Sequence, residues 1–595
     1  LDMVTTAGSD GDVYGALKSL PGTTPVGESG KLFVKGGDSR ESKTYIDGTL
    51  VYVPYSSSTP GQSVRGRFNP FMFSGMMFST GGYSAEYGQA LSSVLALQTN
   101  AMPAQDQLNI SLLSVGGEIG GTKTWDDLSL TSTLSCYNLT PYMRLLPQNV
   151  EWDTEPRSYS GDLSLRWRTG NSGMLKLYAT ANRSRMATME ESLENPDHRF
   201  RYQLVNDNFF LNSSWAGEAG NGWILSAGFS VTCNTDHIRY DTVDRKEQLW
   251  GSHAKFTVKR RFNDHVRVLA GSEFYSKNYG YLFPGTETHP TEAYLNQLVT
   301  GFLESELYAS KRWVTRIGIR TEYSGYLGRS SLAPRISTAY KLSDRSQLST
   351  AYGWFFQDPQ DKYLLCTDQL DFERADHLTL NYILSADRRV LRTELYYKDY
   401  KNLIKFDDPG SGGYGNISNA GHGYAYGLDL FWRDRMSLGS GEYWISYSWI
   451  ESRREYLDYP HEAIPGFTSR HNLSVVYKHF IHRLRSQAGI SCHLSSPRTY
   501  DDPNTEAFND RKTLPYRSLD LNWSYLLKQH LIIHFSVSNV LGLEQSFGRR
   551  YAAVPDSEGI YRSTPVLPRS KRFFIVGCFL TLSRSGDLNQ LDKIN

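Results

Sequence analysis

Segments of about ten residues in which apolar and polar side chains alternate recur along most of this chain. In "RWVTRIGIRTEY" (312–323) the apolar or aromatic residues fall on odd positions and the charged residues on even positions. The same two-residue period returns in the segments 426–433, 519–525 and 531–538. A period of two places alternate side chains on opposite faces of an extended strand. The chain therefore predicts many β-strands, each with one apolar and one polar face.

The length of these strands distinguishes between two classes of all-β protein. Strands of soluble sandwiches have about five or six residues, whereas a tilted strand needs about ten residues to cross a bilayer. Aromatic residues such as Tyr323, Trp432 and Tyr525 lie near the ends of the apolar faces, as in the interfacial girdles of membrane barrels. No apolar run approaches the roughly 18 residues of a membrane helix. We therefore predict an all-β transmembrane barrel, with a large soluble sandwich or β-helix as the alternative.

The connections between the predicted strands differ in length. "KLSDRSQLS" (341–349) reads as a short link, and "DDPGSGGYGNISNAGHG" (407–423) reads as a long polar loop. Short turns on one side and long loops on the other are typical of outer-membrane barrels. About 480 residues, at about 22 residues per strand and connection, predict a barrel of about 22 strands of the plugged class.

Charge and composition argue against several other functions. The net charge is +1 and no long Lys/Arg run occurs, so we expect no nucleic-acid partner. The five cysteines are widely scattered and show neither metal-ligand nor redox spacing. No grouping of residues has a positional reason to perform catalysis. We predict no metal, no cofactor and no enzymatic activity.

Motifs along the chain resemble, in order, those of the TonB-dependent outer-membrane receptors. The N-terminal ones are "LKSLPGT" (17–23), "KLFVKGGDSRESKTYIDG" (31–48) and "FSTGGYSAEYGQALSSVLALQTN" (78–100). The later ones are "LAPRISTAYKLS", "AYGWFFQDP", "ERADHLTLNYIL", "RTELYYKDYKNLI", "NISNAGHGYAYGLDLFW", "IPGFTSRHNLSVVY" and "SVSNVLG". The resemblance implies a globular plug (1–102) inside the lumen of a 22-stranded barrel (103–584), followed by a periplasmic tail (585–595).

The resemblance also implies a function. Such receptors import a scarce nutrient, such as a siderophore chelate or cobalamin, across the outer membrane while TonB and its inner-membrane motor rearrange the plug. A TonB-binding segment would be expected before Leu1. The alternative is a plugged barrel that no longer transports and serves as a docking subunit for surface lipoproteins or assembly machinery. Outer-membrane lipid surrounds the barrel in both cases.

Four positions depart from the family pattern. Family members place one arginine in the plug's "RGG"-like turn and another before the "GG-x-S-A-x-Y-G" segment, facing two wall carboxylates. This chain has Lys35 and Thr80 in the plug, and Asp429 and Thr379 at the matching wall positions. The resemblance thus implies one ionic latch, between Lys35 and Asp429, and one neutral pair. We expect fewer ionic contacts between plug and wall than relatives use.

The remaining plug residues of interest are turn residues and candidate ligand contacts. Asp47 followed by Gly48 is a favourable hairpin turn, and Gly36 and Gly37 permit turns or close backbone approach. Aromatic and cationic side chains in the outward loops of the plug are suited to stacking on, or binding, an anionic chelate. The candidates are Glu28, Tyr52, Tyr55, Arg65, Arg67 and Phe71. The alternative is that these side chains pack against barrel loops.

Overall fold

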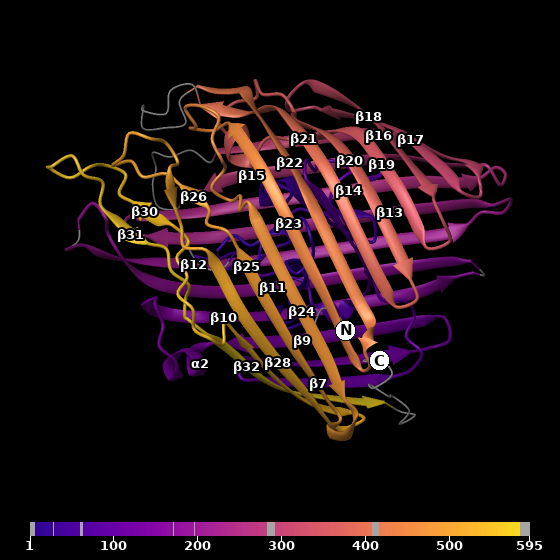
Figure 1. Cartoon of the computed structure of the whole chain (residues 1–595), viewed down its shortest axis with the longest axis horizontal. Coiled ribbons are helices and arrows are strands. Elements are labelled where there is room, and N and C mark those ends of the chain that lie inside the picture. Colours follow the sequence, from indigo (N-terminus) through magenta and orange to yellow (C-terminus); the bar gives the residue numbers. More distant parts are fainter. Residues whose placement is uncertain are drawn as a thin grey trace.

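The computed structural model describes residues 6–27, 29–59, 63–170, 172–195, 197–282, 292–406 and 416–583. Twenty-two antiparallel strands close into one barrel, in which the last strand pairs with the first (Figure 1). The predicted fold class and strand number are confirmed. The barrel strands are β7 (Gln107–Leu113), β8 (Gly116–Thr124), β9 (Leu128–Asn138), β10 (Trp152–Thr169), β11 (Gly173–Glu191), β12 (Arg199–Glu218), β13 (Trp223–Tyr240), β14 (Val243–Arg261), β15 (Val266–Leu282), β16 (Glu292–Ser310), β17 (Trp313–Ser324), β18 (Arg329–Lys341), β19 (Ser346–Gln357), β20 (Glu373–Ala386), β21 (Arg389–Phe406), β22 (Ile417–Leu438), β23 (Gly441–Glu455), β24 (His471–Ile481), β25 (Ser486–Ser495), β28 (Tyr516–Lys528), β29 (Leu531–Ser538) and β32 (Phe573–Ser583).

Alternation along each strand determines which side chains face outward and which face the lumen. On β17, Ile317 and Tyr323 are about half exposed on the outside, whereas Arg320 and Glu322 are buried inside. The same division holds on β22, where Leu430 is exposed and Asp429 is buried. An apolar outer face and a polar inner face are what a barrel in lipid requires. The alternation predicted from the sequence is confirmed.

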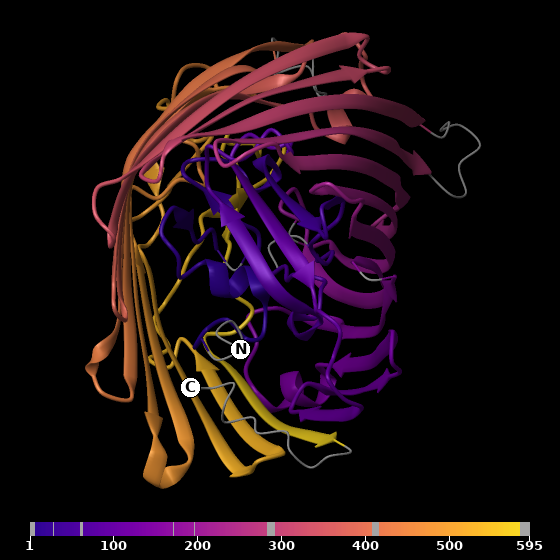
Figure 2. The same cartoon turned by 90° about the vertical axis from the view of Figure 1, so that its right-hand side faces the viewer.

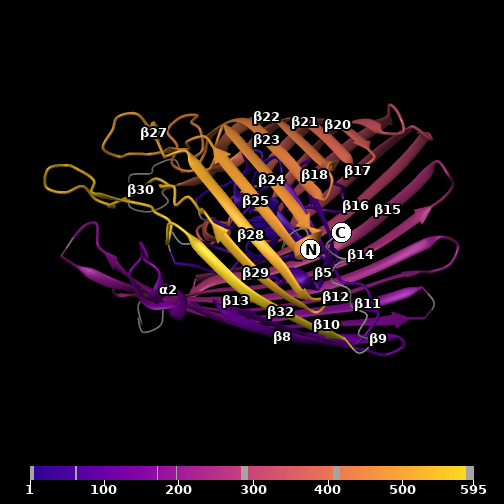
Figure 3. The same cartoon turned by 60° about the horizontal axis from the view of Figure 1, so that its bottom comes forward.

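The two ends of the barrel differ in the length of their connections. Residues 219–222 and 342–345 form short turns at one end, which we call the short-turn end. Residues 456–470, 496–515 and 539–572 form long connections at the other end, the loop end. The loop end carries α2 (Thr140–Leu145), α3 (Asp361–Leu364) and the small hairpins of β26 (Thr499–Tyr500) with β27 (Arg511–Lys512) and β30 (Arg549–Tyr551) with β31 (Ser563–Pro565) (Figures 1 and 3). The short helix η3 (His482–Leu484) is at a short turn.

Part of the predicted long loop 407–423 is strand. β22 begins at Ile417, which pairs with Phe406, so the wall continues through residues that we expected to be loop. Residues 407–415 lie outside the described part of the chain. Several strands have 17–22 residues, more than a bilayer needs, and therefore extend the wall beyond the membrane. The glycine-rich segment "NAGHGY" (419–424) is strand because it pairs with neighbouring strands in the part of the wall that extends beyond the membrane.

The N-terminal region fills the lumen (Figure 2). Its four-stranded sheet has the order β4-β3-β6-β5, with β3 parallel to β6. A two-residue hairpin of Asp47 and Gly48, both with positive φ (44° and 88°), joins β3 to β4, as the sequence predicts. The elements of this region are α1 (Val13–Leu17), β1 (Thr23–Thr24), β2 (Phe33–Val34), η1 (Ser39–Glu41), β3 (Ser42–Ile46), β4 (Thr49–Val51), η2 (Pro70–Met72), β5 (Phe73–Ser79) and β6 (Ser93–Thr99).

The plug and the wall share hydrophobic clusters. Plug residues Tyr45 and Leu91 pack in one cluster with wall residues such as Tyr275 and Phe355. None of the helices in the described ranges is long and apolar enough to span a bilayer. The division into residues 1–102, 103–584 and 585–595 stays a prediction, because the tail lies outside the described residues.

Candidate functional site

Lys35 of the plug lies between two carboxylates of the barrel wall. Its Nζ donates a hydrogen bond to Glu394 Oε1 and lies 3.8 Å from Asp429 Oδ2, and all three side chains are buried. Glu394 on β21 and Asp429 on β22 are direct cross-strand partners. The sequence motifs indicated Asp429 but not Glu394. Glu394 is identified as a second partner of Lys35 by its position directly opposite Asp429, because two neighbouring buried carboxylates need a cation between them.

The predicted neutral pair is also at the plug–wall boundary. Thr80 and Thr379 are both buried. A Cβ added at Gly81, which follows Thr80, would lie 3.3 Å from Thr379 Cγ2. The wall threonine is therefore packed against the glycine turn of the plug, and neither threonine carries a charge.

A second ionic anchor was missed by the sequence motifs. Arg454 of β23 binds Glu41 of η1 through two nitrogens, at 2.6 Å and 3.2 Å, and donates a third hydrogen bond to the carbonyl of Gly36 at 2.9 Å. Arg454 and Glu41 are 0% and 1% exposed. The guanidinium also lies 4.0 Å from the centre of the Tyr400 ring. Nothing in the local sequence pairs residues 413 positions apart, so only the fold reveals this contact.

Hydrogen bonds from plug backbone to wall side chains complete the attachment. Ala85 N donates to Glu304 Oε2 at 2.8 Å, Leu50 N to His253 Nδ1 at 2.8 Å, and Gly22 N to Ser448 Oγ at 2.7 Å. Further ion pairs join Glu86 to Lys255 (3.1 Å) and Asp47 to Lys176 (3.7 Å). The plug is thus held by polar contacts around most of its perimeter.

Two of the candidate ligand residues contact the wall. Tyr52 packs over Gly251, where an added Cβ would lie 2.4 Å from Tyr52 Cδ2, and its hydroxyl donates to Ser252 O at 3.1 Å. Arg67 donates to Asn206 Oδ1 at 2.9 Å and to Asn234 Oδ1 at 3.2 Å. Burial lowers the pKa of Arg67 to about 10. The polar atoms of both side chains are thus hydrogen-bonded to wall residues.

The structure does not bring the other candidates together. Tyr55 lies inside the plug, with its ring 4.6 Å from that of Tyr14 and its oxygen accepting from Leu32 N. Arg65 is exposed and donates to Asp10 O. Phe71 lies at the short-turn end, beside Asn100, away from the outward loops. Glu28 is outside the described residues.

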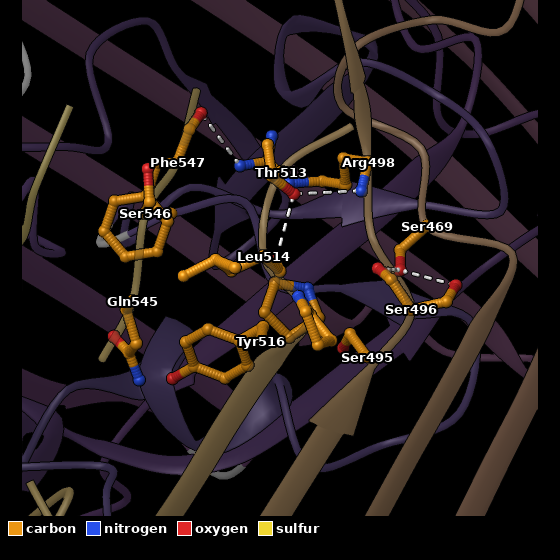
Figure 4. A pocket seen from close by; sticks show the side chains of 13 residues that line it. Ser469, Ser495, Ser496, Arg498, Thr513, Leu514, Tyr516, Gln545, Ser546 and Phe547 are labelled. Carbon is orange, nitrogen blue, oxygen red and sulfur yellow. Dashed lines mark hydrogen bonds between the residues drawn. The ribbon is translucent and has the colours of Figure 1, made fainter. Parts of the chain in front are cut away.

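A cavity at the loop end lies between the plug and the connections of the wall (Figure 4). Plug residues Pro25 and Gly27 form one side of it. The wall side consists of Ser469, Ser495, Ser496, Arg498, Thr513, Leu514, Pro515, Tyr516, Gln545, Ser546 and Phe547. Arg498 donates to Gly466 O at 2.9 Å and to Phe547 O at 3.5 Å, and burial lowers its pKa to about 10. Among the described residues, only carbonyl oxygens accept from this guanidinium, and sequence reasoning missed it. The cavity, of about 10 Å³, has room for about one water molecule.

A cluster of charged groups fixes the connection between β19 and β20 over the plug. Asp361 of α3 accepts from Lys277 Nζ and from Tyr294 Oη, both at 2.5 Å. Asp358 N donates to plug residue Gln89, and Asp358 Oδ2 accepts from Asn296 at 2.8 Å. Burial raises the pKa of Asp358 from 3.8 to about 6. This connection is therefore tied to the plug and to the wall at once.

The raised pKa of Asp358 predicts a pH-dependent stability. The folded protein disfavours the ionised carboxylate, so stability falls as pH rises through the range from about 4 to about 6. We expect Asp358→Asn to be more stable than the wild type at pH 7.5, by on the order of 2 kcal/mol, and equal to it at pH 4. Thermal unfolding in detergent at the two pH values measures the difference. An equal difference at both pH values would contradict the assignment.

Among the described residues, no group of three or more His, Cys, Asp or Glu side chains is placed to hold a metal ion. The five cysteines are free.

Comparisons with known proteins bear on this architecture. A family profile described as "TonB dependent receptor-like, beta-barrel" matches residues 60–540. The fold is similar to the outer membrane transporter YddB from Escherichia coli (TM-score 0.71, 10% identity, covering 96% of each chain). It is similar to the FrpB iron transporter from Neisseria meningitidis (TM-score 0.75, 12% identity, 97% and 98% covered). It is also similar to the ferric enterobactin receptor PfeA from Pseudomonas aeruginosa (TM-score 0.70, 14% identity, 97% of each).

A comparison with curated protein sequences finds no match. The family match covers most of the chain, and the structural likeness extends over plug and barrel together. The outer membrane is accordingly where the barrel resides, with its loop end outside the cell. This chain belongs to the family of TonB-dependent receptors.

Proposed function

We propose that this receptor imports a scarce nutrient, of the class of siderophore chelates or cobalamin, through TonB-driven rearrangement of its plug. One observation carries the proposal: the plug closes the lumen through exchangeable polar contacts. The backbone hydrogen bonds to Ser448, His253 and Glu304 can be replaced by water when the plug moves.

The chemistry of the outward side supports an anionic, ring-bearing ligand. Tyr52 and Arg67 lie in outward segments of the plug, and Arg498 faces the cavity of the loop end. Aromatic rings stack on planar groups, and guanidinium groups bind carboxylates and catecholates. The similar solved structures include an iron transporter and a ferric enterobactin receptor, which agrees with this ligand class.

The test is nutrient-limited growth in cells that carry or lack the receptor, each with a working or an inactive TonB system. A panel of ferric siderophores and cobalamin serves as the sole source of iron or cofactor. We expect growth on one nutrient class to require both the receptor and TonB. Growth that never depends on the receptor, together with its recovery in a stable complex with surface lipoproteins, would favour the docking alternative.

A further inference from the structure

A groove lies on the lipid-facing side of the barrel, away from the lumen. It is a shallow, open hollow of about 530 Å³ across strands β9 to β13. Its apolar lining includes Leu134, Tyr159 and Phe209, which are 62%, 58% and 40% exposed. Gly161 and Ala181 form its floor, because glycine has no side chain and alanine has only a methyl group to cover the strand backbone between the larger residues. The groove therefore lies where lipid chains contact the protein.

Strand register sorts the outward side chains around the groove into three rows. Each row follows direct cross-strand partners from β9 to β13. From the short-turn side to the loop side, the rows are Leu134, Gly161, Ala181, Phe209 and Cys233; then Cys136, Tyr159, Arg183, Asp207 and Thr235; then Asn138, Arg157, Arg185, Val205 and His237. The surface thus changes from apolar to basic toward the loop end.

The position of the basic row along the barrel follows from the distance to the opposite aromatic girdle. Trp167, near the short-turn end of β10, and Tyr159 face the same way and are eight residues apart. Eight residues span about 26 Å along a strand, or about 20 Å along the membrane normal at a tilt near 40°. The apolar band of a barrel is about 25 Å tall, so Tyr159 lies about 5 Å inside its outer edge, and Arg157, two residues farther along the strand, lies at that edge beside the outer headgroups.

The two arginines of the basic row form no ion pair with the described residues, whereas His237 of the same row contacts Asp244 at 2.6 Å. Arg157 and Arg185 are direct cross-strand partners, and adjacent like charges are unfavourable unless an anion lies between them. Arg157 donates to Thr140 Oγ1 at 3.3 Å, and this hydroxyl donates to Glu155 Oε2 at 3.2 Å, so a carboxylate reaches Arg157 only through the threonine. Arg185 has no hydrogen bond or ion pair within the described ranges. Arg183 is paired, 3.5 Å from Asp207. Two guanidinium groups at the headgroup level thus remain available to a phosphate.

We propose that this surface binds a phosphorylated, multiply acylated glycolipid of the outer leaflet, of the lipid A type. Its phosphate would bind Arg157 and Arg185, and an acyl chain would lie over Gly161 and Ala181 between Tyr159 and Phe209. The groove crosses five strands, about 19 Å, which suits a lipid with several parallel chains better than one two-chain phospholipid. Basic clusters beside an apolar surface are the general means of recognising anionic headgroups.

Native mass spectrometry of the purified receptor, titrated with lipid A or with phosphatidylglycerol, tests the proposal. We expect lipid A to bind more tightly than phosphatidylglycerol, and the variant Arg157→Gln/Arg185→Gln to bind lipid A roughly thirtyfold more weakly than wild type. The matched control is Arg260→Gln, which removes an outward arginine that lies over Trp223 near the short-turn end. This control should bind lipid A as wild type does.

A second variant tests the groove without changing charge. Ala181→Trp fills the floor, and we expect it to weaken lipid A binding at least tenfold if the acyl chain lies there. It also keeps the proposal testable if the arginine variant does not fold. Equal affinity of the wild type and either folded variant for lipid A would overturn the proposal. Equal affinity of the wild type for phosphatidylglycerol and lipid A would overturn the choice of a glycolipid.

Discussion

Arg454→Met is expected to destabilise the attachment of the plug to the barrel wall by about 3–5 kcal/mol. The substitution leaves the Glu41 carboxylate buried without its cation and removes the hydrogen bond to Gly36 O. Both partners of the ion pair are almost completely buried, so water cannot replace the lost contact in place. We expect a lower unfolding temperature in detergent, faster proteolysis of the plug and entry of large antibiotics that the intact receptor excludes.

The double variant Glu41→Gln/Arg454→Met isolates the pair interaction. Removing both charges leaves no uncompensated ion, so the double variant should recover most of the stability lost in Arg454→Met. The matched control is Arg345→Met, which breaks an exposed pair with Asp387 at 3.7 Å and should change stability by less than about 1 kcal/mol. A cost for Arg454→Met no larger than that of the control would contradict the anchor.

Lys35→Met is expected to weaken the free energy of attachment of the plug to the wall by about 3 kcal/mol. Glu394 and Asp429 would then face each other across β21 and β22 without the cation that lies between them. Arg392 lies 2.7 Å from the second oxygen of Glu394, so part of the repulsion is compensated from the wall itself. For this reason we expect a smaller effect than at Arg454.

Unfolding in detergent and single-channel conductance measure this effect. Lys35→Met/Asp429→Asn removes one carboxylate as well and should restore much of the stability. Lys31→Met, the same change at a plug lysine outside the latch, is the control. Unchanged conductance and unchanged detergent stability in Lys35→Met would show that the latch does not hold the plug.

The fold could be predicted because its main signal is local. Alternation at Ile317, Ile319, Arg320 and Glu322 already separates the lipid face from the lumen face, and it repeats in strand after strand. The Asp47-Gly48 hairpin is equally local, since these two residues suffice for the turn. The boundary of β22 was missed because "NISNAGHG" has the composition of a loop, and only pairing with β21 and β23 makes it strand.

The contacts of the site depend on register and closure, which a single sequence does not encode locally. Lys35 and Asp429 were paired by resemblance, but Glu394 requires the pairing of β21 with β22. Arg454 meets Glu41 only because the plug sits in one orientation inside the closed barrel. Phe71 was assigned to the outward side by its place in the sequence, whereas the turn through η2 and β5 carries it to the short-turn end.

The central claim is that transport requires the plug to move relative to the wall. Ala85 of the plug faces Gly318 of β17, where an added Cβ would lie 3.0 Å from that of Ala85. The Cβ atoms of a disulfide are about 3.5–4.5 Å apart, so the two positions can be bridged once they separate by about 0.5 Å or more. Ala85→Cys/Gly318→Cys, in a background without the five native cysteines, can therefore be locked by oxidation.

The measurement is uptake of the nutrient found in the growth panel, before and after reduction, with each single cysteine variant as control. The account predicts that uptake is lost in the oxidised double variant, returns on reduction and is unaffected in the single variants. Uptake by the fully oxidised double variant at the wild-type rate would contradict it.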